Sequence, residues 1–271
     1  MKILVTNDDG YSAKGLLALV EILRPMGELL IVAPKTHQSG MSMAVTMGYK
    51  PIAVRKLSTS PGEEWWYLDG TPASCIKYGI DNILWPQKPD LVVCGINHGS
   101  NAATAAIYSG TVGAAMEGAV NGVPSVAVSL DSFSPDADFS AVGEFLPGIL
   151  EKLALSARRR FGAFYNINFP ALPASLIKGV RAANMGMAHW EREYVDYRKF
   201  TAARGLAPDE EYLAAALPDE EIVVMAGDFT SNPGNLPSAD HLLLEQGYVT
   251  ITPQCIDNTD FNELNRLCDI I

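Results

Sequence analysis

The first half of the chain alternates short, continuously apolar runs with longer segments in which apolar residues recur at helical spacing. Continuous runs bounded by turn residues predict buried strands, and recurrence every three to four residues predicts helices. Strands are expected at Ile3–Thr6, Glu28–Ala33, Asp90–Gly95 and Pro124–Leu130, and helices at Lys14–Met26, Thr71–Leu84, Thr111–Asn121 and about Ser140–Arg158. Strands without polar alternation are buried on both faces, so this order predicts an α/β fold with a doubly wound parallel sheet covered by helices.

The rest of the chain departs from this pattern. Val45–Leu68 indicates β-structure inserted between core units, with the Trp65–Tyr67 run in a strand. Residues from about 175 to 240 show no sustained period, so we expect them to extend from the core, partly as hairpins. A strand is expected again at Tyr248–Thr252, followed by a short helix near Thr259–Cys268.

Length and composition limit the classes of function. We expect one domain over residues 1–271, with an α/β core at 1–175 and an extension with a C-terminal segment at 176–271. Hydrophobic residues make up 48% and charged residues 19%, which is typical of a globular protein. The formal net charge of −11 disfavours non-specific binding to long polyanions, so no role in coating nucleic acid is expected. A small phosphorylated ligand stays compatible with this charge, because a bound cation can reverse the local field.

Targeting signals and cysteine spacing indicate the compartment. The chain enters the Ile3–Thr6 strand almost at once, with no apolar signal region before it. No stretch approaches about 18 uninterrupted apolar residues, so no membrane span is expected. The four cysteines have no CxxC spacing, which indicates reduced thiols rather than disulfides or a zinc site. We therefore expect a cytoplasmic protein.

Polar clusters lie where the expected strands end. The first strand runs into Asp8-Asp9-Gly10, and later clusters occupy Pro34–Gly40, Ile96–Asn101 and Tyr108–Gly113. By itself, Asp8-Asp9-Gly10 is equally consistent with a metal site and with an Asp-Gly turn that caps a helix. Each later cluster is consistent with an ordinary loop. In an open parallel sheet, ligands bind outside the carboxyl ends of the strands. All four clusters are expected at that one edge, which favours a common site.

The residue types at this edge predict its chemistry. Two carboxylates, a hydroxyl and a side-chain amide are hard oxygen ligands, which suit Mg²⁺, Mn²⁺ or Ca²⁺ rather than Zn²⁺. Ser109-Gly110-Thr111 precedes an Ala-rich helix, whose N-terminus is a ready anion site. A cation beside a phosphate site is what metal-assisted phosphate hydrolysis requires. The sequence has no P-loop, GxGxxG, GxSxG or HExxH motif, which disfavours the enzyme classes that those motifs mark.

Several of these motifs together resemble the survival protein SurE family of 5′/3′-nucleotidases. The matching segments, in the family's order, are Val5–Gly10, Gln38-Ser39-Gly40, Gly70–Ala73, Gly95-Ile96-Asn97-x-Gly99-x-Asn101, Tyr108–Ala115, Asn166–Pro170 and Gly247–Pro253. The resemblance covers most of the chain, and it is specific as a combination although no single piece is.

The resemblance implies a metal site. One divalent cation per subunit, Mg²⁺ or Mn²⁺, would be held by Asp8, Asp9, Ser39 and Asn97. Asp8 would also be the catalytic residue, because it would orient or deprotonate the attacking water. These four residues are the positions that the oxygen-ligand argument favours.

The resemblance also implies a substrate and an assembly. The activity would be hydrolysis of nucleoside monophosphates, with substrate contacts at Asn101, Ser109, Gly110 and Thr111. The fold would be a Rossmann-like three-layer sandwich with a mostly parallel sheet. A C-terminal extension of hairpin and helix would be exchanged between the subunits of a homodimer or homotetramer.

Two segments depart from the family pattern. After Asn101 the family usually continues x-Gly-x-Asp, whereas this chain has Ala103 and Ala105. The loss of that carboxylate affects loop rigidity or substrate preference. The arginine-rich segment of many members is also weak here, where Met185–Phe200 contains few arginines.

Two non-enzymatic interpretations compete with a nucleotidase. A phosphoacceptor receiver domain also places paired acidic residues after its first strand, but it needs a third aspartate where this chain has Asn97. A non-catalytic module that binds a metal or a nucleotide uses the same residues. Phosphate release from a nucleotide would distinguish the enzyme from the module.

Overall fold

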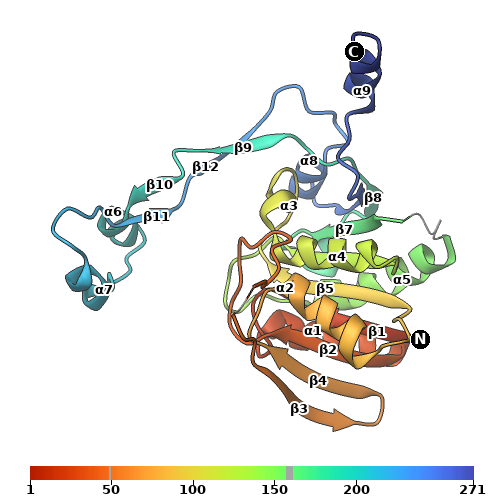
Figure 1. Cartoon of the computed structure of the whole chain (residues 1–271). Helices are drawn as coiled ribbons and strands as arrows, with labels where there is room; N and C mark the ends of the chain where they lie inside the picture. Colours follow the sequence, from red (N-terminus) through yellow and green to blue (C-terminus); the bar gives the residue numbers. More distant parts are fainter. Residues whose placement is uncertain (49, 157–160) are drawn as a thin grey trace. The chain divides into compact units, whose positions relative to one another are not determined.

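The computed structural model describes residues 1–48, 50–156 and 161–271. These residues form two compact units, one made of Met1–Met185 with Pro237–Ile271 and the other of Gly186–Leu236. The first unit carries the large sheet and its helices (Figure 1). Residues 157 and 158, the end of one expected helix, lie outside the described residues.

The first unit is built on a mixed sheet that is parallel at its centre. In the described residues the strand order is β3-β4-β2-β1-β5-β6-β7-β13-β8. The strands are β1 (Lys2–Thr6), β2 (Glu28–Pro34), β3 (Val54–Ser60), β4 (Glu63–Leu68), β5 (Leu91–His98), β6 (Ser125–Leu130), β7 (Ala163–Phe169), β8 (Val180–Ala182) and β13 (Val249–Cys255). The run from β4 to β7 is parallel, whereas β3 pairs antiparallel with β4, and β13 pairs antiparallel with β7. The expected mostly parallel sheet is confirmed.

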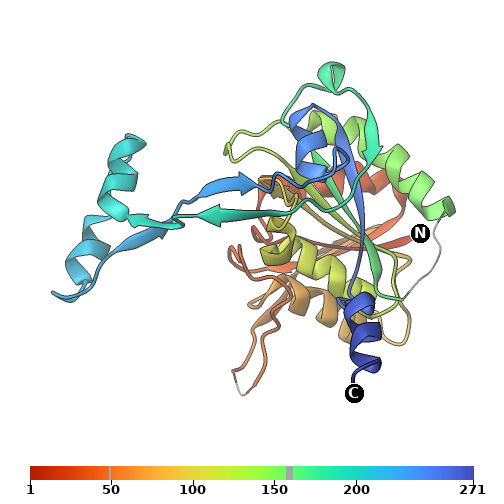
Figure 2. The ribbon, with the colours of Figure 1, turned by 90° about the horizontal axis from the view of Figure 1, so that it is seen from above.

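Helices cover both faces of this sheet. The helices of the first unit are α1 (Lys14–Leu23), α2 (Pro72–Tyr78), α3 (Ala105–Tyr108), α4 (Gly110–Val120), α5 (Ser140–Ser156), α8 (Asp240–Glu245) and α9 (Phe261–Cys268), with 3₁₀ turns at Arg24–Met26 and Ala174–Leu176 and a π-helical turn at Gly79–Ile83. Helices α1 and α5 pack together in one hydrophobic cluster, and α2 and α4 pack together in the other. The views along and across the sheet show these helices on its two sides (Figures 1 and 2). The three-layer α/β arrangement is therefore confirmed.

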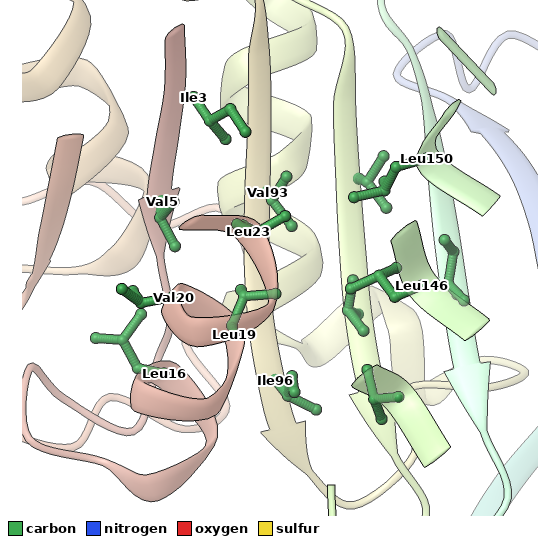
Figure 3. Close-up of a cluster of buried hydrophobic side chains, with 14 of the residues drawn as sticks. Ile3, Val5, Leu16, Leu19, Val20, Leu23, Val93, Ile96, Leu146 and Leu150 are labelled. Carbon is green, nitrogen blue, oxygen red and sulfur yellow. The ribbon is translucent and has the colours of Figure 1, made fainter. Parts of the chain in front are cut away.

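The alternation of side chains along β1 explains why its sequence is apolar throughout. Ile3 and Val5 pack with α1 and α5 (Figure 3), whereas Leu4 packs with the opposite cluster. All three are fully buried. Successive strand residues point to opposite faces, so a strand between two helix layers needs apolar side chains on both. Burial of each such side chain contributes about 1.5–3 kcal/mol.

Some element boundaries differ from the sequence-based expectation. The α-helical part of the first expected helix ends at Leu23, because Pro25 follows and the chain continues as a 3₁₀ turn. The second begins at Pro72 after the cap Thr71, and changes to a π-helical turn at Gly79–Ile83. The expected inserted β-structure is the β3–β4 hairpin, which starts only at Val54.

The second unit consists of short hairpin strands and helices. Its elements are β9 (Ala188–Glu191), β10 (Tyr194–Asp196), α6 (Tyr197–Ala203), α7 (Glu210–Ala215), β11 (Val223–Met225) and β12 (Asp228–Ser231). β9 pairs antiparallel with β12, and β10 pairs antiparallel with β11. These pairs are the hairpins expected in the irregular part of the sequence.

Two further expectations concern cysteines and membranes. All four cysteines are free, and Cys75 and Cys94 are buried among the strands and helices of the core. In the described ranges, no helix combines the length and the apolar character that crossing a membrane requires.

Candidate functional site

A polar cavity lies at the sheet edge where β1, β2 and β5 end and α4 begins. Its volume is ≈ 190 Å³. It is lined by five of the residues expected from the sequence, namely Asp8, Ser39, Asn97, Asn101 and Ser109. The other three expected residues, Asp9, Gly110 and Thr111, are chain neighbours of lining residues but do not line the cavity themselves. Four separate polar clusters of the sequence therefore meet at one site.

Asp8 is a buried carboxylate at the base of this cavity. Its exposed fraction is 3%. Burial raises the pKa of Asp8 to about 6, the hydrogen bond from Thr111 opposes the rise, and the neighbouring charge of Asp9 adds to it. The Thr111 hydroxyl donates to Asp8 Oδ1 at 2.6 Å. The backbone N–H of Asp8 itself and the charge of His37 also lower this pKa, yet the pKa stays above the ordinary value, so the protein compensates the carboxylate only in part.

The turn after β1 fixes the main chain around Asp8. The Asn7 side-chain amide donates to the Gly10 carbonyl at 3.0 Å, and Gly10 has a φ of +107°. That φ lies in the region that favours glycine. The Asp8 carbonyl accepts from the Gln38 N–H at 2.7 Å, which ties the turn to the segment after β2. The Asn-Asp-Asp-Gly sequence thus holds Asp8 against the loop that carries Ser39.

Asp9 points toward two histidines. The distance from His37 Nδ1 to Asp9 Oδ1 is 3.2 Å, and from His98 Nδ1 to Asp9 Oδ2 it is 3.4 Å. The His98 ring also meets Phe139 edge-on, with centroids 5.3 Å apart. Asp9 is therefore surrounded by imidazole donors beside the cavity, while Asp8 lines it.

The loop that carries Ser39 is held against α3 and α4. The Ser42 N–H donates to the Tyr108 carbonyl at 2.9 Å, and its hydroxyl donates to the Ile107 carbonyl at 2.7 Å. A Cβ added at Gly113 would lie 2.0 Å from the Ser42 carbonyl oxygen. Glycine at position 113 is therefore needed for the loop to approach the helix this closely.

A bulge at the end of β5 sets the position of Asn97. The β5–β6 register shifts between Cys94 and Asn97, and Gly95 lies between them with a φ of +141°. The Asn97 Nδ2 donates to the carbonyls of Gly99, at 2.8 Å, and His98, at 3.2 Å. Because both bonds use the amide nitrogen, this orientation leaves Oδ1 as the oxygen that can bind a cation.

The N-terminus of α4 keeps two main-chain donors for a ligand. Ser109 caps the helix, since its hydroxyl accepts from the Val112 N–H at 3.1 Å and its carbonyl accepts from the Gly113 N–H at 2.9 Å. The Gly110 and Thr111 N–H groups make no hydrogen bond to any described residue. First-turn N–H groups have no partner within their helix, and they bind anions.

Asn101 connects the cavity to β6 and β7. Its N–H donates to Asn168 Oδ1 at 2.7 Å, and its carbonyl accepts from Asn166 Nδ2 at 2.8 Å. Its own amide donates to the Ser129 hydroxyl at 2.8 Å. The asparagines of β7 therefore hold the loop that follows β5, which explains why a buried strand contains two polar side chains.

The two alanines that depart from the family pattern take different positions. Ala103 is buried with a φ of +52°, and its N–H donates to Asp240 Oδ1 at 2.9 Å. A positive φ at a non-glycine residue is strained, so this backbone conformation accounts for the glycine usual at that position. Ala105 lines the cavity, so the aspartate of the family pattern would lie at the cavity wall if it stood at this position.

The donor set fits a hard divalent cation. Among the described residues, no three His, Cys, Asp or Glu side chains lie close enough together to hold a metal ion. Cation binding at this cavity would therefore need the Ser39 hydroxyl and the Asn97 amide oxygen as well as carboxylate. Such oxygen donors suit Mg²⁺ or Mn²⁺ rather than a sulfur- or nitrogen-rich zinc site.

The cavity also contains residues that the sequence did not single out as ligands. Tyr108 and Phe133 line it, and their exposed fractions are 62% and 82%. Phe133 lies in the polar loop that follows β6. Its place after a core strand, at the same edge as the other clusters, is the signal that could have identified it.

Comparisons with known proteins agree along nearly the whole chain. Residues 3–192 match the family model described as survival protein SurE. The 5′-nucleotidase SurE of Bacteroides thetaiotaomicron is 36% identical over 269 residues, covering 98% of this chain and 95% of the relative. The 5′-nucleotidase SurE of Syntrophobacter fumaroxidans is 37% identical over 268 residues, with 98% of both chains covered. The crystal structure of the SurE protein from Aquifex aeolicus superposes with a TM-score of 0.78 at 27% identity, covering 100% of this chain and 99% of that one.

Proposed function

Because the chain belongs to the SurE family, we propose that it is a divalent-metal-dependent nucleotidase that hydrolyses nucleoside monophosphates to nucleoside and phosphate. The observation that carries the proposal is the buried carboxylate of Asp8 in one cavity with Ser39 and Asn97, next to the N-terminus of α4. A buried carboxylate favours a cation that compensates its charge, and a helix N-terminus favours a phosphate. Together they provide a phosphomonoesterase site.

The metal ligands in this proposal are Asp8, Asp9, Ser39 and Asn97, with one Mg²⁺ or Mn²⁺ per subunit. A cation held there supplies Lewis-acid polarisation of a phosphoryl oxygen and acidifies water. Asp8 orients the attacking water by accepting its hydrogen bond, and it takes a proton from it. The Thr111 hydroxyl holds the Asp8 carboxylate in place for that role through its 2.6 Å bond.

The phosphate lies at the start of α4 in this proposal. Support comes from the Gly110 and Thr111 N–H groups, which have no partner among the described residues, and from Ser109, which lines the cavity. Asn101 acts from the facing loop, which its bonds to β6 and β7 hold rigid. The chain's own groups thus bind and orient the phosphate so that the water attacks in line with the leaving oxygen.

The proposal extends to assembly and location. The protein acts in the cytoplasm as a homodimer or homotetramer, and residues 176–271 contribute the contact between subunits. Support comes from the Gly186–Leu236 unit, which exposes large apolar side chains including Trp190, Tyr194, Tyr212 and Met225. Exposed apolar groups in such number mark surfaces that bind protein.

Phosphate release from AMP tests the proposed activity. Purified protein is incubated with AMP in Mg²⁺, in Mn²⁺ and in EDTA, and free phosphate is measured. We expect release with either metal and none with EDTA. AMP binding without release in any metal would favour a non-catalytic binding module and would contradict the proposal.

A further inference from the structure

Tyr108 and Phe133 form an aromatic rim at the opening of the cavity. Both line it, although 62% of Tyr108 and 82% of Phe133 are exposed. Phe133 comes from the loop after β6, and Tyr108 is the last residue of α3. No aromatic ring of the described residues packs against either one. Both rings therefore offer a face to a ligand that enters the cavity.

Phe133 is held in its exposed position by the main chain. The Gly99 N–H donates to the carbonyls of Leu130, at 2.8 Å, and Ser132, at 3.0 Å. A Cβ added at Gly99 would lie 2.3 Å from a ring carbon of Phe133, so the ring rests on bare backbone two residues from Asn97. An apolar ring fixed at the mouth of a polar cavity is an anchor for an apolar ligand group rather than part of a core.

Tyr108 is also anchored, and it directly precedes the residues that receive phosphate. Its carbonyl accepts from the Ser42 N–H at 2.9 Å, so its backbone is tied to the loop that carries Ser39. The Tyr108 ring and the proposed phosphate site therefore belong to adjoining residues of one segment, which is tied to the Ser39 loop. A ligand whose phosphate lies at α4 would reach the two rings with its other end.

The volume of the cavity indicates which part of a nucleotide fits inside it and which part stays at its opening. At ≈ 190 Å³ the cavity is smaller than the roughly 300–1,000 Å³ of pockets that enclose a drug-sized ligand. It has room for a phosphate with part of its sugar, and a nucleobase would remain at the opening. Aromatic side chains stack on any nucleobase, because every base has a π-face.

We propose that Tyr108 and Phe133 form a base-binding subsite that makes nucleotides better substrates than sugar phosphates without a base. The inference rests on the proposed function, because it assigns the substrate class of the same site. The base is held by stacking, so the subsite accepts different bases. Loss of either ring should weaken binding of the base. Neither residue takes part in the chemistry of phosphate release.

The test compares AMP with ribose 5-phosphate, which carries the same sugar and phosphate but no base. For Phe133→Ala we expect kcat/KM for AMP to fall about 5- to 100-fold, mainly through KM, because one stacking partner is lost. Hydrolysis of ribose 5-phosphate should stay within about 2-fold of the wild type, which also shows that the variant folds. Tyr108→Phe keeps a ring and should keep AMP activity, whereas Tyr108→Leu should lose it as Phe133→Ala does.

A matched control and a binding measurement complete the experiment. Phe261→Ala removes an aromatic ring that is 57% exposed on α9 and does not line the cavity, so it should change neither substrate. An equal loss on both substrates, or no loss on either, in Phe133→Ala would overturn the subsite. If the wild type hydrolyses neither substrate, the proposed function fails. Calorimetric titration with adenosine still tests the subsite in that case: weaker binding by Phe133→Ala supports it, and equal or absent binding overturns it.

Discussion

At the residue scale, the position of Asp8 that suits cation binding is unfavourable for the stability of the metal-free protein. The folded chain buries this carboxylate almost completely and places the charge of Asp9 beside it. Both effects disfavour the ionised form. The Thr111 hydroxyl, the Asp8 main chain and the charge of His37 oppose them only in part. A group that costs stability when ionised is expected where a ligand compensates for its charge.

The stability of the metal-free protein should therefore depend on Asp8 and on pH. The folded-state pKa of about 6 lies above the ordinary 3.8, so the folded chain binds a proton more tightly than the unfolded chain. The free energy of unfolding then falls as pH rises from about 4 to about 6, and the loss is complete above that. Asp8→Asn removes this loss, so it should be more stable than the wild type above about pH 7, by up to about 3 kcal/mol.

Urea unfolding in EDTA at about pH 4 and about pH 8 measures this difference. The advantage of Asp8→Asn should be large at the higher pH and almost absent at the lower one. Added Mg²⁺ should reduce it at the higher pH, because a bound cation compensates the wild-type charge. An advantage of equal size at both pH values would contradict the assignment.

The sequence predicted several residues that line the cavity, but it did not predict the hydrogen bonds between them. Asp8, Ser39 and Asn97 were identifiable because each lies at or after the carboxyl end of a core strand, and these strand ends share one edge. The bond from Thr111 to Asp8 was not, because it joins residues 103 positions apart through side-chain geometry. Phe133 was harder to predict, because a single phenylalanine in a polar loop has no signal besides its place after a core strand.

At the scale of elements, the site depends on the packing of the Ser39 loop against α4. Gly113→Ala places a Cβ where the Ser42 carbonyl oxygen lies, only 2.0 Å away, and a main-chain atom cannot rotate aside. The loop must shift, and Ser39 shifts with it. We expect kcat/KM for AMP to fall at least about 10-fold, because small displacements of positioning groups have large kinetic effects.

Gly148→Ala is the matched control for this substitution. Gly148 is exposed in α5, and a Cβ there meets nothing within 4 Å. Activity should be unchanged, and stability should rise by up to about 1 kcal/mol, the usual gain of alanine over glycine in a helix. Equal activity of the two variants in the phosphate-release assay would show that the loop contact does not position Ser39.

The central strands and the strand at Tyr248–Thr252 were predictable, whereas β7 was not, for a physical reason. Strands buried on both faces have continuous apolar sequences, as in β1, β2, β5 and β6. In β7 that pattern is broken by Asn166 and Asn168. The Asn166 side chain donates to the Asn101 carbonyl, and the Asn168 side chain accepts from the Asn101 N–H. The placement of β13 between β7 and β8 is a non-local pairing, which hydrophobic periodicity does not encode.

At the scale of the whole molecule, the Gly186–Leu236 unit should determine the oligomeric state. Tyr194 and Met225 are paired across β10 and β11 and are 66% and 64% exposed. We expect the wild-type chain, with a monomer mass of 29.2 kDa, to elute at two or four times that mass in size-exclusion chromatography with light scattering. The double variant Tyr194→Asp and Met225→Asp should elute at a lower mass than the wild type, because the two charges disrupt an apolar contact between subunits.

Leu17→Asp serves as the control for that experiment. Leu17 is 46% exposed on α1, which belongs to the other unit, so the substitution adds an exposed negative charge outside the Gly186–Leu236 unit. Its elution should match the wild type. A monomeric wild type, or an unchanged mass in the double variant, would contradict a role for this unit in assembly.

The central claim is that Asp8 and a divalent cation together release phosphate from a nucleotide. The most direct test measures phosphate release from AMP by the wild type and by Asp8→Asn, each in Mn²⁺, with circular dichroism to confirm that both are folded. We predict that Asp8→Asn loses at least about 100-fold in rate, the usual contribution of a positioned proton acceptor. A folded Asp8→Asn variant that releases phosphate as fast as the wild type would contradict the claim.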